Sequence, residues 1–442
     1  MVLHRFRWSI GLGAIIVATC GQPAVQPPRA VRSWVAIDGG TLIDPAHQEV
    51  RSNVRIVIHN NRIACVGSSE ACRIPDNAQR IDARNRWIMP GLVDAHVHVT
   101  EEPGPYVPLY LAFGITTVRD LGGYVDSLRA LRRRIDAGAE IGPRVFFAGH
   151  PVDGSPTAWP QLYPNVPRVA RDTTEARAAV RNAVADGADF IKLYGALSVN
   201  QVRAAVSEAH AHGRKATIDV WNLHPDSVIA AGVDGFEHRV PPIEPPGPST
   251  RMEWSRNRLG IDVALTTMRE KGVALTSTLL LFDRMLMGEL PVSEPTFLAL
   301  SPALRDRSAE MLAQAQPADS ARRANRRRSY EYMCESIRLF TAKGGLLLAG
   351  TDSYYLTVYP GDLHRELELL VACGATTWQA LSAATSSPVQ WLGADSLGQV
   401  AAGKLADLLI LRADPSRDIR NTRQIELIMK NGRVYRPEEI AR

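Results

Sequence analysis

Two histidines stand two residues apart at the end of a mostly apolar run. His96 and His98 follow the run from Met89 to Ala95, and such a run predicts a strand. Because side chains alternate between the two faces of a strand, both imidazoles point the same way. Two imidazoles on one face at a strand end form a pair of metal ligands. His-x-His alone is a weak signal, so this interpretation depends on residues further along the chain.

Three more polar residues end short apolar runs later in the chain, namely Lys192, His238 and Asp352. An ammonium group that points into an apolar mouth is unfavourable without a partner. Carboxylation by CO2 would turn Lys192 into a carbamate, an anion that bridges two metal ions. A snorkelling lysine is the alternative interpretation. Each residue alone fits a structural role, but their shared place at strand ends is hard to assign to packing.

The middle of the chain alternates predicted strands with predicted helices. The helical patterns include 174–185 and 202–212, and the first strand begins at Leu92. Seven more strands are predicted at 115–118, 144–148, 190–193, 216–220, 235–237, 273–276 and 346–349. This repeat predicts an α/β fold with a (β/α)8 TIM barrel over residues 89–394. Active sites of such barrels lie at the C-terminal ends of the strands, where the residues above fall.

The two ends of the chain share a different pattern of short alternating strands and tight turns. It covers residues 33–88 and 395–442, and Asn431-Gly432 between two strands is a strong hairpin signal. We therefore expect one small β-sandwich domain built from both termini. Within the barrel, the stretch 280–343 is too long for a simple loop and is expected to form a lid over the site.

Composition places the chain among ordinary globular proteins. Of its 442 residues, 45% are hydrophobic and 22% are charged, with a net charge of +5. This charge is too small and too scattered to indicate nucleic acid as a partner. The densest basic run, Arg322–Arg328, lies near Glu331 and Glu335, which favours a solvated helix face. A small-molecule substrate is the expected partner, and a homo-oligomer is left open.

The first residues have the features of an export signal. Residues 1–20 combine a basic start with a short apolar core that ends at Cys20. Small residues before Cys20 resemble a bacterial lipoprotein site, which would anchor the protein to the membrane; plain cleavage nearby is the alternative. Residues 21–32 predict a tether, and the expected location is the periplasm or cell envelope. There Cys65 and Cys72 either pair across a turn-like segment or remain two thiols.

At this point the chain resembles the amidohydrolase superfamily over nearly all of its mature length. It is most similar to the imidazolonepropionase-like branch, which includes metal-dependent Xaa-Pro dipeptidases. Besides the residues above, the resemblance is carried by Phe113–Asp120, His364–Leu370, Ala380–Thr385 and Gly403–Leu408. It implies a TIM barrel joined to a β-sandwich, and hydrolysis of a carbon–nitrogen or related ester bond.

The resemblance also implies a role for each site residue. His96 and His98 match the ligands of the more buried metal, and His238 matches the strand-six ligand. Lys192 matches the carboxylated lysine that bridges the two metals. Asp352 matches the aspartate that ligates metal and shuttles the proton, so it is the expected catalytic residue. The expected cofactors are one or two divalent metal ions, with zinc favoured, and the CO2-derived carbamate on Lys192.

One position departs from the family pattern. The family places a histidine at the end of strand five, where this chain has Asp219. Three outcomes are open: Asp219 is a metal ligand, His224 reaches in from the next loop, or the second metal is weak or missing. A turn or helix-capping role for Asp219 is the alternative interpretation.

Tyr194 and His150 are the candidate substrate-binding residues. Tyr194 shares a strand face with Lys192, and His150 ends strand three before the long loop 151–164. The expected reaction is hydrolysis of an amide or peptide bond, with a dipeptide or N-acyl amino acid as substrate. A cyclic amide, a lactone or an organophosphate ester is the second option. A metal-poor, degenerate binding protein is the third.

Overall fold

The computed structural model describes residues 34–99, 106–159, 165–240, 258–287, 295–298, 300, 302–315, 320–353 and 358–440. The chain divides into two compact units, Met1–Arg32 and Ser33–Arg442, and all of these residues belong to the second unit. The expected signal peptide, Cys20 and the tether lie outside the described residues. Among the described helices, none has the length and apolar character that crossing a membrane requires.

Eight of the described parallel strands match the eight strands that the sequence predicts. They are β6 (Leu92–Val97), β7 (Ile115–Asp120), β8 (Arg144–Phe147), β11 (Ile191–Leu193), β12 (Ala216–Ile218), β13 (Gly235–His238), β14 (Ala274–Ser277) and β15 (Leu347–Ala349). Nearly all of their residues are buried, as expected for parallel strands that are covered on both faces.

Backbone hydrogen bonds join these strands into a ring. Strands β6, β7 and β8 pair in one sheet, and β11 to β15 pair in order within another. The amide of Asp189 donates to the carbonyl of Phe147, which links β8 to the segment that leads into β11. A bridge between Val97 and Ser353 links β6 to the segment that follows β15. The arrangement is consistent with the predicted TIM-like barrel.

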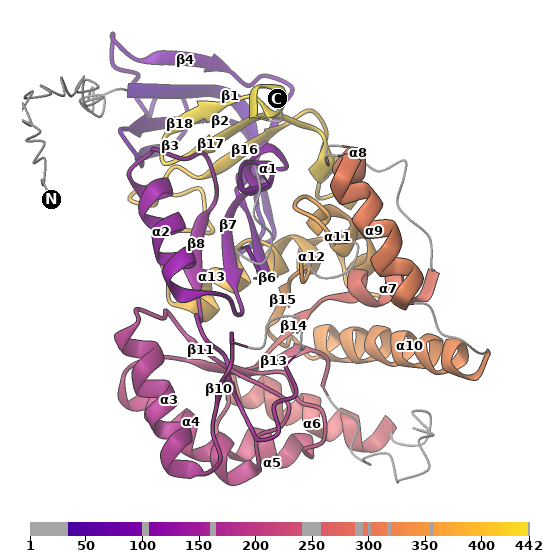
Figure 1. The fold of residues 1–442 in the computed structure, drawn as a ribbon. Helices are drawn as coiled ribbons and strands as arrows, with labels where there is room; N and C mark the ends of the chain where they lie inside the picture. The colour runs from indigo at the N-terminus through magenta and orange to yellow at the C-terminus, as the bar shows by residue number, and fades with distance from the viewer. Residues whose placement is uncertain are drawn as a thin grey trace, which may run out of the picture. The chain divides into compact units, whose positions relative to one another are not determined.

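Helices connect the strands, and their N-termini carry sequence-coded caps. Helix α3 begins after Asp172, whose carboxylate accepts from two backbone amides, and α4 begins with a capping box of Ser198 and Gln201. Helices α3 to α6 lie outside strands β11 to β14 (Figure 1). The helices up to α6 are α1 (Val107–Ala112), α2 (Val125–Asp136), α3 (Thr173–Ala185), α4 (Val199–Ala211), α5 (Pro225–Ala230) and α6 (Arg258–Lys271).

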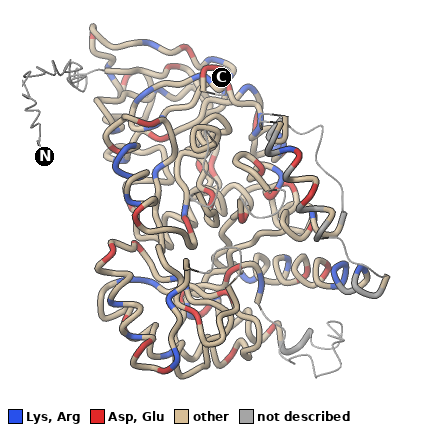
Figure 2. The backbone as a smooth tube through the Cα atoms, viewed as in Figure 1, with Lys and Arg blue, Asp and Glu red and all other residues tan. Residues whose placement is uncertain are grey.

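The described parts of the predicted lid region are helical. It contains α7 (Leu279–Met287), α8 (Pro295–Leu298), α9 (Pro302–Ala315) and α10 (Ser320–Ala342). The basic run lies in α10, where Arg323, Arg327 and Arg328 are exposed, which agrees with a solvated face. Positive and negative residues are interspersed along the chain (Figure 2). The remaining barrel helices are α11 (Leu363–Ala372), α12 (Thr377–Ala383) and α13 (Ser386–Leu392).

Both ends of the chain contribute to one eight-stranded sheet. Strand β5 is the junction, because it pairs with β1 on one side and with β16 on the other. These strands pair as a single sheet, so the expected two-sheet sandwich is not confirmed, and the domain boundaries remain predictions. The strands are β1 (Trp34–Asp44), β2 (Glu49–His59), β3 (Arg62–Gly67), β4 (Gln79–Asp82), β5 (Trp87–Pro90), β16 (Leu408–Leu411), β17 (Ile425–Lys430) and β18 (Arg433–Tyr435). A 3-10 helix, η2 (Ile419–Arg423), and a final short helix, α14 (Pro437–Ile440), complete this end.

Two disulfides join the described cysteines. Cys65 pairs with Cys72, which decides between the two options that the sequence left open. Cys334 in α10 pairs with Cys373 at the end of α11, a link that the sequence did not indicate. The second bond connects the lid region to the helix that follows the last barrel strand.

Candidate active site

The barrel strands deliver most of the predicted site residues to one cavity at their C-terminal ends. Its volume is about 270 Å³, slightly below the usual range of about 300–1,000 Å³ for small-molecule sites. The cavity contains every predicted metal ligand and Tyr194, whereas His150 is not among its described lining residues. The lining residues are His96, His98, Trp159, Lys192, Tyr194, Asp219, Trp221, His238, Arg239, Leu281, Phe282, Met285 and Asp352.

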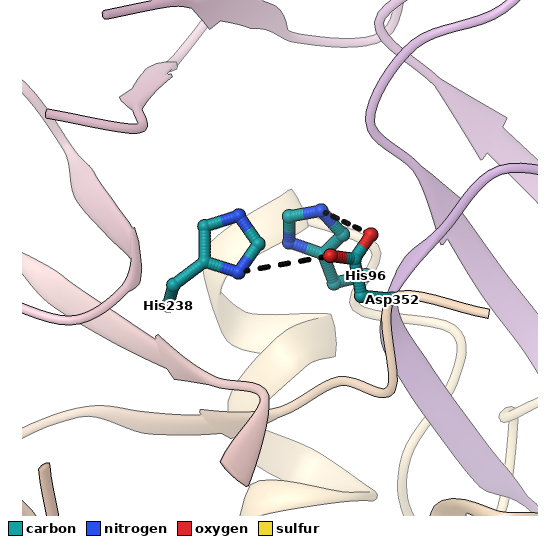
Figure 3. A group of neighbouring side chains, drawn as sticks. All are labelled: His96, His238 and Asp352. Atoms are coloured by element: carbon teal, nitrogen blue, oxygen red, sulfur yellow. Dashed lines mark ion pairs between the residues drawn. The ribbon is translucent and has the colours of Figure 1, made fainter. Parts of the chain in front are cut away.

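His96, His238 and Asp352 come from three different strand ends and point toward one another (Figure 3). The Nε2 atom of His96 lies 3.4 Å from Oδ1 of Asp352, and Nδ1 of His238 lies 3.9 Å from Oδ2. The Nε2 atom of His98 lies 3.2 Å from the same Oδ1. One ligand atom from each of His96, His238 and Asp352 lies within 4.8 Å of the other two, close enough to share a metal ion.

The hydrogen bonds of His96 show that this geometry suits a cation. Its Nδ1 lies 2.8 Å from the carboxylate of Glu237, so Nδ1 carries the proton and donates it. Burial lowers the pKa of His96 to about 3, although nearby carboxylates oppose this, so the ring is neutral. The Nε2 lone pair therefore faces the carboxylate of Asp352. Two acceptors that face each other are compatible when a positive ion lies between them.

The surroundings of His98 and Asp352 also favour metal binding. Nδ1 of His98 donates to the carbonyl of Gly122 at 2.8 Å, which turns Nε2 toward the cavity. Burial by itself would raise the pKa of Asp352, but His96, His98 and His238 together hold that pKa well below its usual range. Asp352 is therefore an ionised carboxylate surrounded by imidazoles, as a metal ligand must be.

Glu237 and Arg119 are buried residues that hold His96 in its orientation, and the sequence alone did not single them out. Arg119 donates to Glu237 at 2.6 Å and to the carbonyl of Ala95, so the carboxylate that orients His96 is itself paired. Burial opposes ionisation of Glu237, but Arg119 and His96 hold its pKa well below its usual range. Both residues stood inside motifs already noticed, because Glu237 precedes His238 and Arg119 belongs to the segment Phe113–Asp120.

The backbone at two candidate ligands is left-handed. His238 has a φ of 65° and Asp352 a φ of 62°, which is uncommon for residues other than glycine. The loop at Asp352 is held by Asp94, which accepts from both the amide and the hydroxyl of Thr351. Such strain persists where the surroundings impose it, and it is concentrated at functional sites.

The burial and hydrogen bonding of Lys192 bear most directly on the expected carbamate. Its side chain is buried, and Nζ has no hydrogen-bond partner among the described residues. Burial lowers the pKa of Lys192, although Glu237, Asp219 and Asp352 oppose the shift. A buried amine without a hydrogen bond is unfavourable unless another group satisfies its hydrogen-bonding capacity. The surroundings of Lys192 therefore suit carboxylation, which would convert the amine into a metal ligand.

Asp219 lies where the family pattern expects a histidine. Asp219 directly follows strand β12 and lines the cavity, and its Oδ2 lies 3.6 Å from Nε2 of His238. The indole N–H of Trp221 donates to the same oxygen at 3.2 Å. His224, by contrast, caps helix α5 and accepts from the amide of Asp226. Of the two residues considered for this position, Asp219 is the one at the cavity.

His150 lies apart from the cavity lining, whereas the long loop after it contributes to that lining. The ring of His150 contacts the carbonyl of Val166 through Nδ1 at 2.6 Å. The same loop places Trp159 in the cavity, and the buried carboxylate of Asp153 accepts from the amide of Trp159. Two short strands, β9 (Val152–Asp153) and β10 (Arg168–Val169), frame the loop and were not predicted.

The fold and the site together define a class of barrel hydrolases. In this class a parallel barrel carries histidines, a lysine and carboxylates at the C-terminal ends of its strands. Residues 87–435 match the profile described as the Amidohydrolase family. This chain belongs to the Amidohydrolase family and is a hydrolase that acts on carbon–nitrogen bonds. The resemblance drawn from the sequence is therefore confirmed at the level of the superfamily.

Individual proteins are also similar to this chain. An uncharacterised protein of Mycobacterium tuberculosis is 26% identical over 381 residues, covering 79% of this chain and 86% of its own length. A Xaa-Pro dipeptidase solved with methionine bound in its active site has a TM-score of 0.70 at 24% identity, and the match covers 91% of this chain and all of that one. Bottromycin amidohydrolase has a TM-score of 0.72 at 22% identity, with 92% and 88% covered. The likeness to the two solved structures shows the fold alone.

Proposed function

We propose that this chain hydrolyses the amide bond of a small dipeptide or N-acyl amino acid with the help of one or two divalent metal ions. The neutral His96 that faces the ionised Asp352 beside the buried Lys192 is the observation that carries the proposal. The cavity of about 270 Å³ suits a small substrate rather than a polypeptide. One structural neighbour is a Xaa-Pro dipeptidase, which supports the choice of a peptide bond.

The metal-binding residues in this proposal come from five strand ends. His96, His98 and Asp352 would hold one ion, and Asp219 and His238 would hold a second. Lys192, as its carbamate, would bridge the two, and zinc is the favoured metal because imidazoles and carboxylates are its usual ligands. When bound, the metal supplies a Lewis acid that lowers the pKa of water toward neutrality and polarises the scissile carbonyl.

The remaining steps belong to this chain's own side chains. The carboxylate of Asp352 accepts a proton from the attacking water and delivers it to the leaving amine. Glu237 keeps Nδ1 of His96 protonated and so fixes its orientation. Tyr194, in the same lining, would hydrogen-bond a carbonyl or carboxylate of the substrate.

Metal content per chain, measured on protein purified without added metal or chelator, is the first experiment. Near two ions per chain supports a binuclear site that includes Asp219, and a screen of dipeptides and N-acyl amino acids follows. Near one ion indicates a mononuclear hydrolase. No metal, even after zinc or manganese is added with bicarbonate, would contradict the proposal and favour a binding protein.

We also propose that the protein is exported and anchored by a lipid on Cys20. The two disulfides support this, because such bonds persist in oxidising compartments. A Cys20→Ala variant is expected to move from the membrane fraction to the soluble fraction. The Cys65→Ala variant, which keeps Cys20, is the matched control, and retention of Cys20→Ala in the membrane fraction would refute the anchor.

A further inference from the structure

Three aromatic side chains form a continuous row in the lining of the cavity. Trp159 packs edge-on against Tyr194 with ring centroids 4.9 Å apart, and Tyr194 lies 5.7 Å from Trp221. At the other end of the row, Trp159 packs edge-on against His98 at 5.9 Å. The row thus begins beside a candidate metal ligand and presents an aromatic surface to a substrate bound in the cavity.

Trp221 is the most exposed member of this row. Its side chain is 47% exposed although it lines the cavity. Its indole N–H is held by Asp219, and a Cβ at Gly195 would come within 2.8 Å of the ring, so the ring rests against bare backbone. A large aromatic face that is fixed in place but still hydrated gains stability when an apolar group covers it.

Helix α7 adds an aliphatic and aromatic contribution to the same cavity. Leu281, Phe282 and Met285 all line it. Metal ligation needs none of these side chains, and neither does proton transfer at Asp352. An apolar lining of this extent beside a polar centre is typical of a site that recognises an apolar part of its ligand.

We propose that the cavity selects substrates that carry an aromatic or bulky apolar side chain, with Trp221 as a specificity-determining residue. This inference rests on the proposed function and names the substrate class within it. A phenyl or indole group packs against the face or edge of the row, in the offset or edge-to-face arrangements that aromatic rings prefer. A small side chain leaves the row in contact with water.

The test compares the binding of 3-phenylpropionate and propionate to the full-length protein by isothermal titration calorimetry. Neither acid contains an amide bond, so binding is measured apart from turnover. The wild type is expected to bind 3-phenylpropionate at least about tenfold more tightly, because a phenyl group leaves water on binding. In Trp221→Ala the ratio should fall below about threefold, whereas Trp221→Phe keeps a ring and should retain most of it.

Two further variants complete the experiment. Trp34→Ala removes an indole that stacks on His59 in the terminal sheet, and it should leave the ratio unchanged. Met285→Ala removes part of the α7 lining and should lower the ratio even if Trp221→Ala fails to fold. Equal binding of the two acids by the wild type would overturn the inference, as would an unchanged ratio in a folded Trp221→Ala.

Failure of this inference is distinguishable from failure of the proposed function. Cleavage of dipeptides without any preference between the two acids would overturn the aromatic selectivity and leave the hydrolase proposal standing. A clear preference between the acids without cleavage of any amide by the metal-loaded protein would support the selectivity and contradict the hydrolase proposal.

Discussion

His96 shows how neighbouring residues prepare a side chain to bind a metal. The carboxylate of Glu237 fixes its tautomer, and Arg119 keeps that carboxylate ionised in a buried environment. Removing one partner of such a buried pair leaves an uncompensated charge, which typically destabilises a protein by about 3–5 kcal/mol. At this scale the site consists of the cavity residues together with the buried groups behind them.

Asp352→Asn is expected to abolish turnover while the fold remains. The amide cannot accept the proton from water, and general acid–base catalysis typically contributes about 10²–10⁴-fold in rate. Steady-state kinetics on the best substrate of the screen, with circular dichroism as the folding check, measures this. Asp136→Asn, an exposed change in α2, is the control, and unchanged kcat in Asp352→Asn would remove the proton-shuttle role.

Lys192→Ala is expected to lose most of its bound metal, because the bridging ligand is gone. A short carboxylic acid such as acetate, supplied at high concentration with the metal, should restore part of the metal content and activity. Elemental analysis of the purified variant gives the measurement. Lys271→Ala, at an exposed position in α6, should keep the wild-type metal content. Full metal retention by Lys192→Ala would argue against a bridging carbamate.

Helix α7 is held at its N-terminus by a buried carboxylate from another helix. Glu366 in α11 accepts from the amides of Leu279 and Leu280 and from the hydroxyl of Ser277. Carboxyl oxygens at a helix N-terminus accept from backbone amides that have no partner within the helix. Since α7 contributes three lining residues to the cavity, Glu366 positions part of the wall of the site. The conspicuous motif His364–Leu370 thus has a structural role at the level of elements.

Glu366 should also make stability depend on pH. Burial raises the pKa of Glu366 from its ordinary 4.5 to about 7, although its hydrogen bonds oppose the shift. Between these values the folded state binds more protons than the unfolded state, so the free energy of unfolding falls as pH rises. Each pKa unit corresponds to about 1.4 kcal/mol, which gives a contribution of about 3 kcal/mol.

Glu366→Gln cannot ionise, so its stability should fall less steeply between pH 4.5 and 8 than that of the wild type. Urea denaturation at a series of pH values provides the comparison, and slopes rather than absolute stabilities are compared. Glu270→Gln in α6, an exposed position, is the matched control. Parallel profiles for the wild type and Glu366→Gln would show that this carboxylate does not couple folding to protonation.

At the scale of the whole molecule, the sequence predicted the barrel and the residues at its strand ends. Periodicity located all eight strands, and the barrel topology then brought His96, Lys192 and Asp352 together. The left-handed backbone at Asp352 was not predictable, because three-dimensional packing imposes it. The support from Glu237 was not predictable either, because its partners are far away in the sequence.

The bond between Cys334 and Cys373 was also missed, since the two cysteines are 39 positions apart in the sequence and form no recognisable pattern. Replacing both by alanine is expected to lower the free energy of unfolding by about 2–4 kcal/mol, because the unfolded chain regains the freedom of a long loop. Urea denaturation without reductant measures this. Cys65 and Cys72 close a loop of only seven residues, so the matching double variant should lose less stability. Equal losses would contradict the loop-length explanation.

The position of strand β5 has a consequence for how the protein is made. Its partner β16 pairs through Leu408 with Pro90, so roughly 300 residues must be synthesised between the two strands. At typical translation rates of about 5–20 residues per second, the side of β5 that pairs with β16 remains unpaired for on the order of 15–60 s. An unpaired strand edge is a site for aggregation during such a delay. The chain is thus most exposed to misassembly before residues 408–435 are available to pair, and loss of those residues would make that exposure permanent.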